Sequence, residues 1–380
     1  MPLARSESAL RLTSIDVLPS SDLICFSHLR WDFVYQRPQH LLERFARELR
    51  VFYFEEPIYS DGVKPWLSIE KTEEGVTRIV PYLPYGLGED GEIAAQKELL
   101  GFLCAEQQIS RPITWYYTPM SLPFSGHLDA AAVVYDCMDE LSAFRGAPPV
   151  LLEREQALLA RADVVFTGGH SLYEAKRGRH PNVHAFPSSV DVAHFRRARA
   201  RLPEPLDQAS IPHPRIGHYA VLDERLDIDL VAAIADARPD WQIVLVGPVV
   251  KIDPASLPRR PNIHYLGGKR YEELPAYLSG WDAAFMPFAL NESTRFISPT
   301  KTPEYLAAGK PVVSTPVTDV VRTYGERGLV QIADTPAGFV AALERILTTG
   351  DERRPWLDDV DRTLGEMSWD QTWARMRELL

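Results

Sequence analysis

The sequence has few cysteines, no long apolar run and no excess of basic residues. Only 3 of its 380 residues are cysteine, which predicts a reducing compartment, the cytoplasm, and excludes a disulfide-based fold. No run approaches the roughly 18 apolar residues that a membrane-spanning helix needs. Asp and Glu number 52 against 41 Lys and Arg, a net charge of −11. Nucleic acid is therefore not expected as a partner, because phosphate binding needs clustered cations.

Motifs for metals and dinucleotide cofactors are also missing. His180 and His184 are four residues apart, but Pro181 lies between them and excludes a helical metal pair. Two Asp-x-Asp triplets, at 227–229 and 359–361, fall in helical stretches and are interpreted as solvated charges. No G-x-G-x-x-G motif follows a strand. We therefore expect neither a metal nor a cofactor.

Short apolar strands that alternate with helices are the main pattern of the chain. An apolar fraction of 45% and a charged fraction of 24% are typical of globular proteins, and the length predicts about two domains. The polar segment from Phe195 to Pro214 divides the pattern and is interpreted as a linker. We therefore predict an α/β fold, with two Rossmann-like, doubly wound parallel-sheet domains facing a central cleft. The predicted strands are Leu23–Phe26, Val51–Phe54, Ile113–Tyr117, Val133–Tyr135, Val164–Thr167, Arg215–Tyr219, Ile243–Val246, Ile263–Leu266, Ala284–Pro287, Val312–Ser314 and Leu329–Ile332.

The stretch from Ser298 to Glu304 is the most informative part of the sequence. It predicts the start of a helix at the carboxyl ends of the strands, where ligands of such folds bind. Lys301 would add a full positive charge for a diphosphate, and Glu304 would accept hydrogen bonds from two ribose hydroxyls. The alternative is a capped surface helix whose Lys301 and Glu304 are solvated.

The run from Lys301 to Val313 resembles the donor-binding signature of group 1 glycosyltransferases with the GT-B fold. The resemblance covers nearly the whole chain, because further stretches match in order and spacing. The nearest branch resembles bacterial cell-surface polysaccharide glycosyltransferases of the teichuronic acid type. The further matching stretches are 162–167, 183–191, 262–267, 274–278 and 368–369, and those of the nearest branch are 37–42, 135–139 and 223–227.

The resemblance implies a division of labour between domains. Residues 1–200 would bind the acceptor, residues 201–365 the nucleotide-sugar, and residues 366–380 would form a helix that returns to the first domain. It implies transfer of a hexosyl-type sugar from a nucleotide-diphosphate-sugar to a saccharide or lipid-linked acceptor. Retention of configuration, and a place in bacterial surface polysaccharide or glycoconjugate synthesis, are implied as well.

The donor site is expected in the second domain. Arg225 would share the diphosphate with Lys301, unless it pairs with its own acidic neighbours. Tyr265 and Gly267 would line the base pocket through backbone atoms, as in the family. The predicted donor-binding residues are His218, Arg225, Tyr265, Gly267, Lys269, Ser298, Thr300, Lys301, Thr302 and Glu304.

The acceptor and catalytic candidates lie in the first domain. Trp31 can stack on a sugar face and Asp32 can bind its hydroxyls. The predicted acceptor-binding residues are Trp31, Asp32, Arg37 and His40, and the predicted catalytic residues are Asp136, Asp139 and His28. One aspartate would orient or deprotonate the acceptor hydroxyl. Asp139 could instead cap a helix.

Two features depart from the family. Phe296 stands where the family has the first of two glutamates, and nearby Glu292 is a candidate substitute. The loop 28–33 lacks the family's glycine pair. Two other functions therefore stay open: a nucleotide-sugar epimerase of the same fold, and a non-catalytic GT-B carbohydrate-binding or scaffold module.

A basic amphipathic stretch suggests peripheral contact with the inner face of the membrane. Arg37, Arg44, Arg47 and Arg50 could meet anionic lipid, although Glu43 and Glu48 dilute the charge. The alternative is a solvated helix face.

Overall fold

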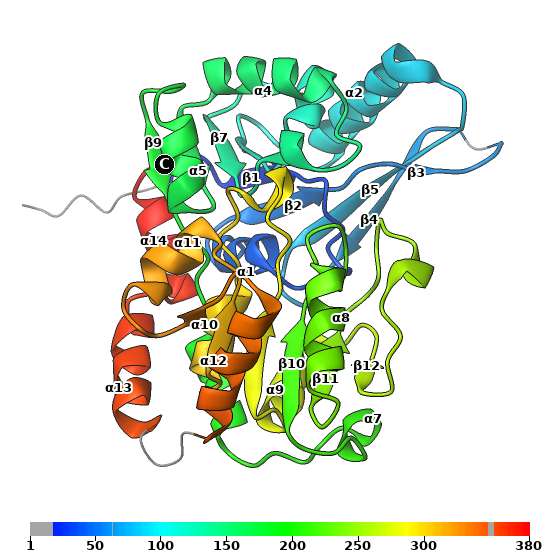
Figure 1. Ribbon diagram of the computed structural model, residues 1–380. Coiled ribbons are helices and arrows are strands. Elements are labelled where there is room, and N and C mark those ends of the chain that lie inside the picture. The colour runs from blue at the N-terminus through cyan, green and yellow to red at the C-terminus, as the bar shows by residue number, and fades with distance from the viewer. Residues whose placement is uncertain (1–17, 63, 349–352) are drawn as a thin grey trace, which may run out of the picture.

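Two α/β domains form the molecule (Figure 1). The computed structural model describes residues 18–62, 64–348 and 353–380, and residues 1–17, 63 and 349–352 lie outside this description. The first sheet has nine strands, in the order β3-β5-β2-β1-β6-β7-β8-β9 with β4 paired to β5. The second has six, in the order β12-β11-β10-β13-β14-β15. The predicted pair of parallel, doubly wound sheets is confirmed.

The central strands of the first domain are buried between helices on both faces. All five residues of β1 (Asp22–Phe26) are buried, because each face meets an apolar cluster. The other strands are β2 (Arg50–Phe54), β3 (Ile58–Tyr59), β4 (Trp66–Lys71), β5 (Thr77–Leu83), β6 (Ile113–Tyr116), β7 (Ala132–Cys137), β8 (Val164–Thr167) and β9 (Val183–Ala185). The helices are α1 (Arg37–Phe45), α2 (Gly88–Glu106), α3 (Leu122–Ser125), α4 (Val150–Arg161) and α5 (His170–Lys176).

The second domain repeats this plan around two apolar clusters of its own. A side chain at Gly217 would collide with the Trp281 ring, since a Cβ there would lie 2.0 Å from it. The strands are β10 (Arg215–Tyr219), β11 (Gln242–Val246), β12 (Ile263–Tyr265), β13 (Ala283–Met286), β14 (Val312–Ser314) and β15 (Gln331–Ile332). The helices are α6 (Val192–Arg196), α7 (Leu206–Ala209), α8 (Ile228–Ala237), α9 (Leu274–Ser279), α10 (Lys301–Ala307), α11 (Thr318–Val320), α12 (Pro336–Thr348) and α13 (Arg353–Leu364).

The strands β3, β4 and β5 were not predicted. β4 and β5 form an antiparallel hairpin at one edge of a sheet that is otherwise parallel. β4 has no fully buried residue, so its sequence lacks the apolar run that marks the other strands. Gly75 supplies the positive φ of +86° that the turn of the hairpin needs.

The linker prediction for residues 195–214 is wrong. Phe195 is fully buried and belongs, with Ala198 and Ile211, to an apolar cluster of the second domain. The chain therefore crosses between the domains before Val192, where α6 begins, rather than near residue 200.

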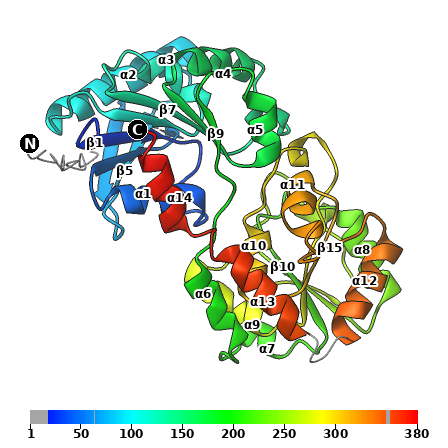
Figure 2. The same ribbon diagram turned by 90° about the vertical axis from the view of Figure 1, so that its left-hand side faces the viewer.

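The C-terminal helix α14 (Trp369–Arg377) returns to the first domain and lies beside α1 (Figure 2). Trp369 and Met376 join the core of that domain. Arg44 Nε lies 2.9 Å from Asp370 Oδ1, and Arg47 pairs with the same carboxylate at 3.2 Å.

The basic residues of α1 and its neighbourhood are therefore paired inside the chain, and their contact with anionic lipid stays a prediction. Arg37 is buried against Asp136, and Arg50 pairs with Asp22 at 2.6 Å. Among the described residues, no helix is long and apolar enough to cross a membrane.

Candidate functional site

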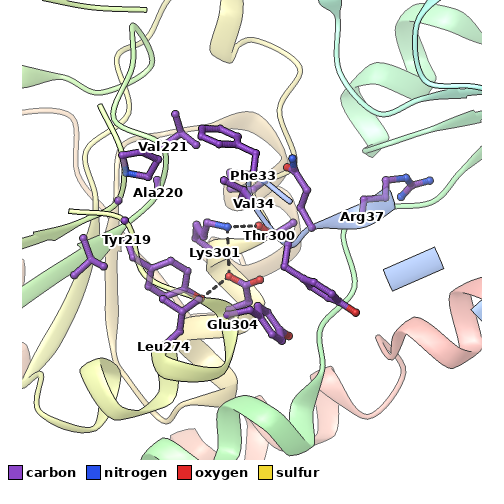
Figure 3. A pocket seen from close by; sticks show the side chains of 18 of the residues that line it. Phe33, Val34, Arg37, Tyr219, Ala220, Val221, Leu274, Thr300, Lys301 and Glu304 are labelled. Carbon is purple, nitrogen blue, oxygen red and sulfur yellow. Dashed lines mark hydrogen bonds and ion pairs between the residues drawn. The ribbon is translucent and has the colours of Figure 1, made fainter. Parts of the chain in front are cut away.

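A cavity of about 840 Å³ lies between the two domains (Figure 3). The first domain contributes the loop 31–37, the 138–139 segment and Gly168, and the second contributes the ends of β10 and β11 and the start of α10. These segments follow strand ends or start helices, as expected for doubly wound sheets. The volume falls in the range of small-molecule sites, about 300–1,000 Å³.

Lys301 and Glu304 lie one turn apart on α10 and both line the cavity. Lys301 Nζ donates to Thr300 Oγ1 at 2.8 Å and lies 3.6 Å from Glu304 Oε2 (Figure 3). The Tyr219 hydroxyl donates to the same Glu304 oxygen at 2.5 Å. Burial raises the pKa of Glu304, while Lys301 and Tyr219 oppose the shift. These side chains are held in the site by one another, so the alternative of a solvated surface helix does not apply.

His218 enters the cavity as a neutral imidazole. Burial lowers its pKa to about 4, and the positive charge of Lys301 acts in the same direction. Nδ1 lies 3.0 Å from the carbonyl oxygen of Phe285 and therefore carries the proton that it donates. Nε2 is then left as a hydrogen-bond acceptor.

Arg225 lines the cavity while it is held by Asp223. Its Nε lies 3.0 and 3.2 Å from the two Asp223 oxygens, and Nη2 lies 2.7 Å from Oδ2. Both alternatives for Arg225 are thus realised in part, because it faces the cleft and also pairs with its own acidic neighbour.

Asp139 lines the same cavity as Arg225, but from the first domain. Burial raises its pKa to about 6; Asp223 adds to the shift, whereas Arg225 and Arg37 oppose it. A carboxylate with this pKa is ionised at neutral pH and can still accept a proton, as a general base requires.

Three predicted site residues are buried in structural roles and are not among the described residues that line the cavity. Asp136 is fully buried and held by Arg37. Thr302 is fully buried, and its hydroxyl lies 3.4 Å from the sulfur of Met286. His40 stacks on Trp369 at 4.7 Å between centroids, and burial lowers its pKa.

Three more predicted residues are not among the described residues that line this cavity. Tyr265 donates to the carbonyl of Pro258 at 2.9 Å and lines a separate hollow. Gly267 accepts a hydrogen bond from the Gly247 amide at 2.9 Å. His28 lies near Lys251, and burial lowers its pKa to about 4. The predicted residues that do line the cavity are Trp31, Asp32, Arg37, Asp139, His218, Arg225, Lys269, Ser298, Thr300, Lys301 and Glu304.

Sequence reasoning missed several residues of the lining. Tyr219 ends a predicted strand and Gly168 follows one, so their positions carried a signal. A Cβ at Gly168 would lie 2.2 Å from the Met138 carbonyl oxygen, so the close approach requires glycine. Glu74 and Tyr271 also line the cavity, but nothing in their sequence neighbourhood indicated it.

Glu292 does not replace the missing family glutamate. Its side chain is 77% exposed and pairs with Arg295 at 3.6 Å. Phe296 instead packs against the apolar cluster of the first domain. The position therefore contributes an apolar contact between domains.

Hydrogen bonds also join the domains beside the cavity. The Ser171 amide donates to Asp319 Oδ1 at 3.0 Å, and Ser188 Oγ donates to the Ser298 carbonyl at 2.9 Å. The first joins α5 to α11, and the second joins the segment after β9 to the segment before α10.

Comparisons with known proteins agree with this architecture. Residues 222–349 match the family model described as glycosyl transferases group 1. A protein named for teichuronic acid biosynthesis as a glycosyltransferase, TuaH of Bacillus subtilis (strain 168), is 29% identical over 264 residues. That match covers 63% of this chain and 64% of TuaH, so the chain spans slightly less than two thirds of this curated relative.

Solved structures show the same fold at low identity. Sucrose-phosphate synthase from Thermosynechococcus elongatus has a TM-score of 0.70 and 16% identity, with 95% of this chain and 98% of that chain covered. A UDP-forming α,α-trehalose-phosphate synthase from Burkholderia xenovorans has a TM-score of 0.68 and 13% identity, with 95% and 98% covered. The predicted resemblance is thus confirmed: the chain has the GT-B fold, and its residues 222–349 match the family model of group 1 glycosyl transferases.

Proposed function

We propose that this protein transfers a hexosyl-type sugar from a nucleotide-diphosphate-sugar to a saccharide or lipid-linked acceptor. The observation that carries the proposal is the placement of Lys301 and Glu304 on one turn of α10, facing a cavity between two domains. The name of TuaH supports a role in bacterial surface polysaccharide or glycoconjugate synthesis. The three free cysteines fit a cytoplasmic location.

In the second domain, Lys301 would bind the diphosphate and stabilise the charge that builds on the leaving phosphate. Arg225 would donate further hydrogen bonds to the diphosphate, although Asp223 already balances the charge of Arg225. Glu304 would accept hydrogen bonds from the ribose, with Oε2 oriented by Tyr219. The unprotonated Nε2 of His218 would accept a hydrogen bond from a sugar hydroxyl. With Lys301 as the cation, the proposed reaction uses no metal and no further cofactor.

In the first domain, Asp139 would take the proton of the attacking acceptor hydroxyl. Its raised pKa suits this role, and Arg225 keeps a positive charge close to the ionised form. The oxygen of the acceptor forms the new bond to the anomeric carbon as the bond to the diphosphate breaks.

Retention of configuration follows from the family resemblance and is part of the proposal. Front-face attack aided by the leaving phosphate needs no enzyme nucleophile, which agrees with an apolar Phe296 where the family has a glutamate. Proton NMR of the anomeric signal in the first product formed distinguishes the two outcomes, and an inverted product would contradict this part.

The donor site is tested by thermal shift with uridine, guanosine, adenosine and thymidine diphosphates on wild type and Lys301→Ala. Because a bound ligand stabilises by mass action, one diphosphate should raise the melting temperature of wild type and much less that of the variant. No shift with any diphosphate would count against the proposal.

Asp139 and His218 face the same cavity, and this favours a nucleotide-sugar epimerase as the second candidate. An epimerase would convert the donor to its isomer without an acceptor. Incubation of the donor alone, followed by chromatography, therefore separates the two activities.

A further inference from the structure

One face of the β4–β5 hairpin forms a continuous strip that starts at the cavity. Asp32 lines the cavity and pairs with Arg78 on β5, and Arg78 also pairs with Glu70 on β4. Figure 1 shows β4 and β5 running from beside α1 to the outer edge of the first sheet. The strip is thus attached to the site at one end and exposed at the other.

The register of the hairpin defines the members of this strip. Glu70 is opposite Arg78, Ser68 opposite Val80, and Trp66 opposite Tyr82. Alternate residues of a strand share one face, so these pairs lie in a row. From Glu70 to Trp66 the row extends about 13 Å at roughly 3.3 Å per residue.

Two stacked aromatic rings lie at the outer end of the row. The Trp66 and Tyr82 rings stack at 4.3 Å between centroids with an interplanar angle of 11°. Trp66 remains 46% exposed, so part of the ring is open to solvent. Ile58 on β3 pairs with Tyr82 from the other side and is also exposed. A flat, half-exposed indole suits the apolar face of a sugar ring, and the carboxylates at the other end of the row suit the hydroxyls of a further sugar.

The charge of the strip favours a saccharide over a membrane. Asp32 and Glu70 give two carboxylates against the single guanidinium of Arg78, so the strip is net negative. Anionic lipid would be repelled by this charge. Carboxylates and a serine hydroxyl are instead suitable partners for neutral or amino sugars.

We propose that the β4–β5 strip binds the acceptor as a saccharide chain, with sugars beyond the reacting one lying along it and one of them stacking on Trp66. This inference rests on the proposed glycosyl transfer and specifies its acceptor class. The reacting end enters the cavity past Asp32, and the chain leaves over Glu70 and Ser68.

The test measures binding of wild type, Trp66→Ala and Trp66→Phe to a printed array of bacterial oligosaccharides, from single sugars to long neutral, amino and acidic chains. The matched control is Phe102→Ala, which removes an aromatic ring that is 54% exposed on α2, away from the strip. Wild type should bind chains in preference to single sugars. Trp66→Ala should bind about tenfold more weakly, whereas Trp66→Phe and Phe102→Ala should stay within twofold to threefold of wild type.

Three outcomes would overturn the inference. Wild type could bind no saccharide chain, or Trp66→Ala could bind the chains as well as wild type does. In the third outcome, Trp66→Ala loses binding to phosphatidylglycerol vesicles and keeps its binding to saccharides. The nucleotide-diphosphate thermal shift separates this failure from failure of the proposed function. It should be the same in all four proteins, because the strip lies outside the donor site, and its absence in wild type would count against glycosyl transfer itself.

Discussion

Arg37 and Asp136 form a buried ion pair between α1 and the end of β7. Arg37 Nη2 lies 2.8 Å from Asp136 Oδ1, and Nε lies 3.1 and 3.0 Å from the two oxygens. Arg37 Nη1 also donates to the carbonyl of Phe186 at 2.8 Å, where the chain leaves the first domain. The pair fixes the base of the acceptor loop and the start of the crossing segment.

Substitution of Asp136 by Asn should therefore destabilise the fold. Loss of the negative charge leaves the buried Arg37 uncompensated, which costs about 3–5 kcal/mol in comparable pairs. Urea unfolding measures this cost. Asp359→Asn is the matched control, because Asp359 belongs to an exposed pair with Arg362, and it should change stability by less than about 0.5 kcal/mol. A stable but inactive Asp136→Asn would restore the catalytic role predicted from the sequence.

Lys301→Ala should weaken nucleotide-diphosphate binding by about 10- to 100-fold, because a hydrogen bond to a charged group contributes about 1.5–3 kcal/mol. Isothermal titration calorimetry with the diphosphate that shifts wild type gives the change. Lys269→Ala is the control: Lys269 lines the same cavity but is held by Asp207 at 2.7 Å. Equal losses in both variants would show that general positive charge, and not Lys301, binds the phosphates.

Glu304→Gln should raise stability and lower affinity together. Burial raises the pKa of Glu304, so its neutral form is favoured in the folded state. The shift therefore stabilises the folded protein at pH values below the pKa that Glu304 has in the unfolded chain. This stabilisation is lost as the pH rises through the pKa that Glu304 has in the folded protein. At pH 8 the variant should therefore unfold about 2–4 °C higher than wild type, a change of roughly 1 kcal/mol. At pH 4 the difference should shrink, which calorimetry at both pH values checks.

Asp139 should set the acid limb of the pH–rate profile. Its pKa of about 6 means that the carboxylate is progressively protonated below pH 6 and can no longer accept the acceptor proton. kcat/KM should fall tenfold per pH unit there. Asp139→Asn should lose about 100- to 10,000-fold in rate and show no such limb. An unchanged limb in the variant would assign it to another group.

Gly169→Ala should loosen the contact between the domains. A Cβ at this position would lie 2.2 Å from Asp319 Oδ2 and 2.8 Å from the Ser298 Cβ, so one side of the contact has to move. Small-angle scattering should then show a larger radius of gyration than in wild type. Gly178→Ala, with no atom within 4 Å of its new Cβ, is the control and should match wild type.

The sequence determined the two-domain α/β plan and much of the donor site. Strands such as Leu23–Phe26 and Ile243–Val246 could be predicted because burial on both faces requires continuous apolar runs. Lys301 and Glu304 were identified because they lie close in sequence on one local helix. The exposed hairpin of β4 and β5 was missed because a strand with one open face leaves no such run.

Only the tertiary structure decided which polar residues face the cavity. Asp136 lies at the end of β7 and Asp139 just after it, yet Arg37, 99 residues away from Asp136, pairs with the first inside the protein, whereas the second lines the cleft. His40 became a core residue because α14 places Trp369 over it. Such roles depend on contacts between distant segments, which packing fixes and local sequence patterns do not record.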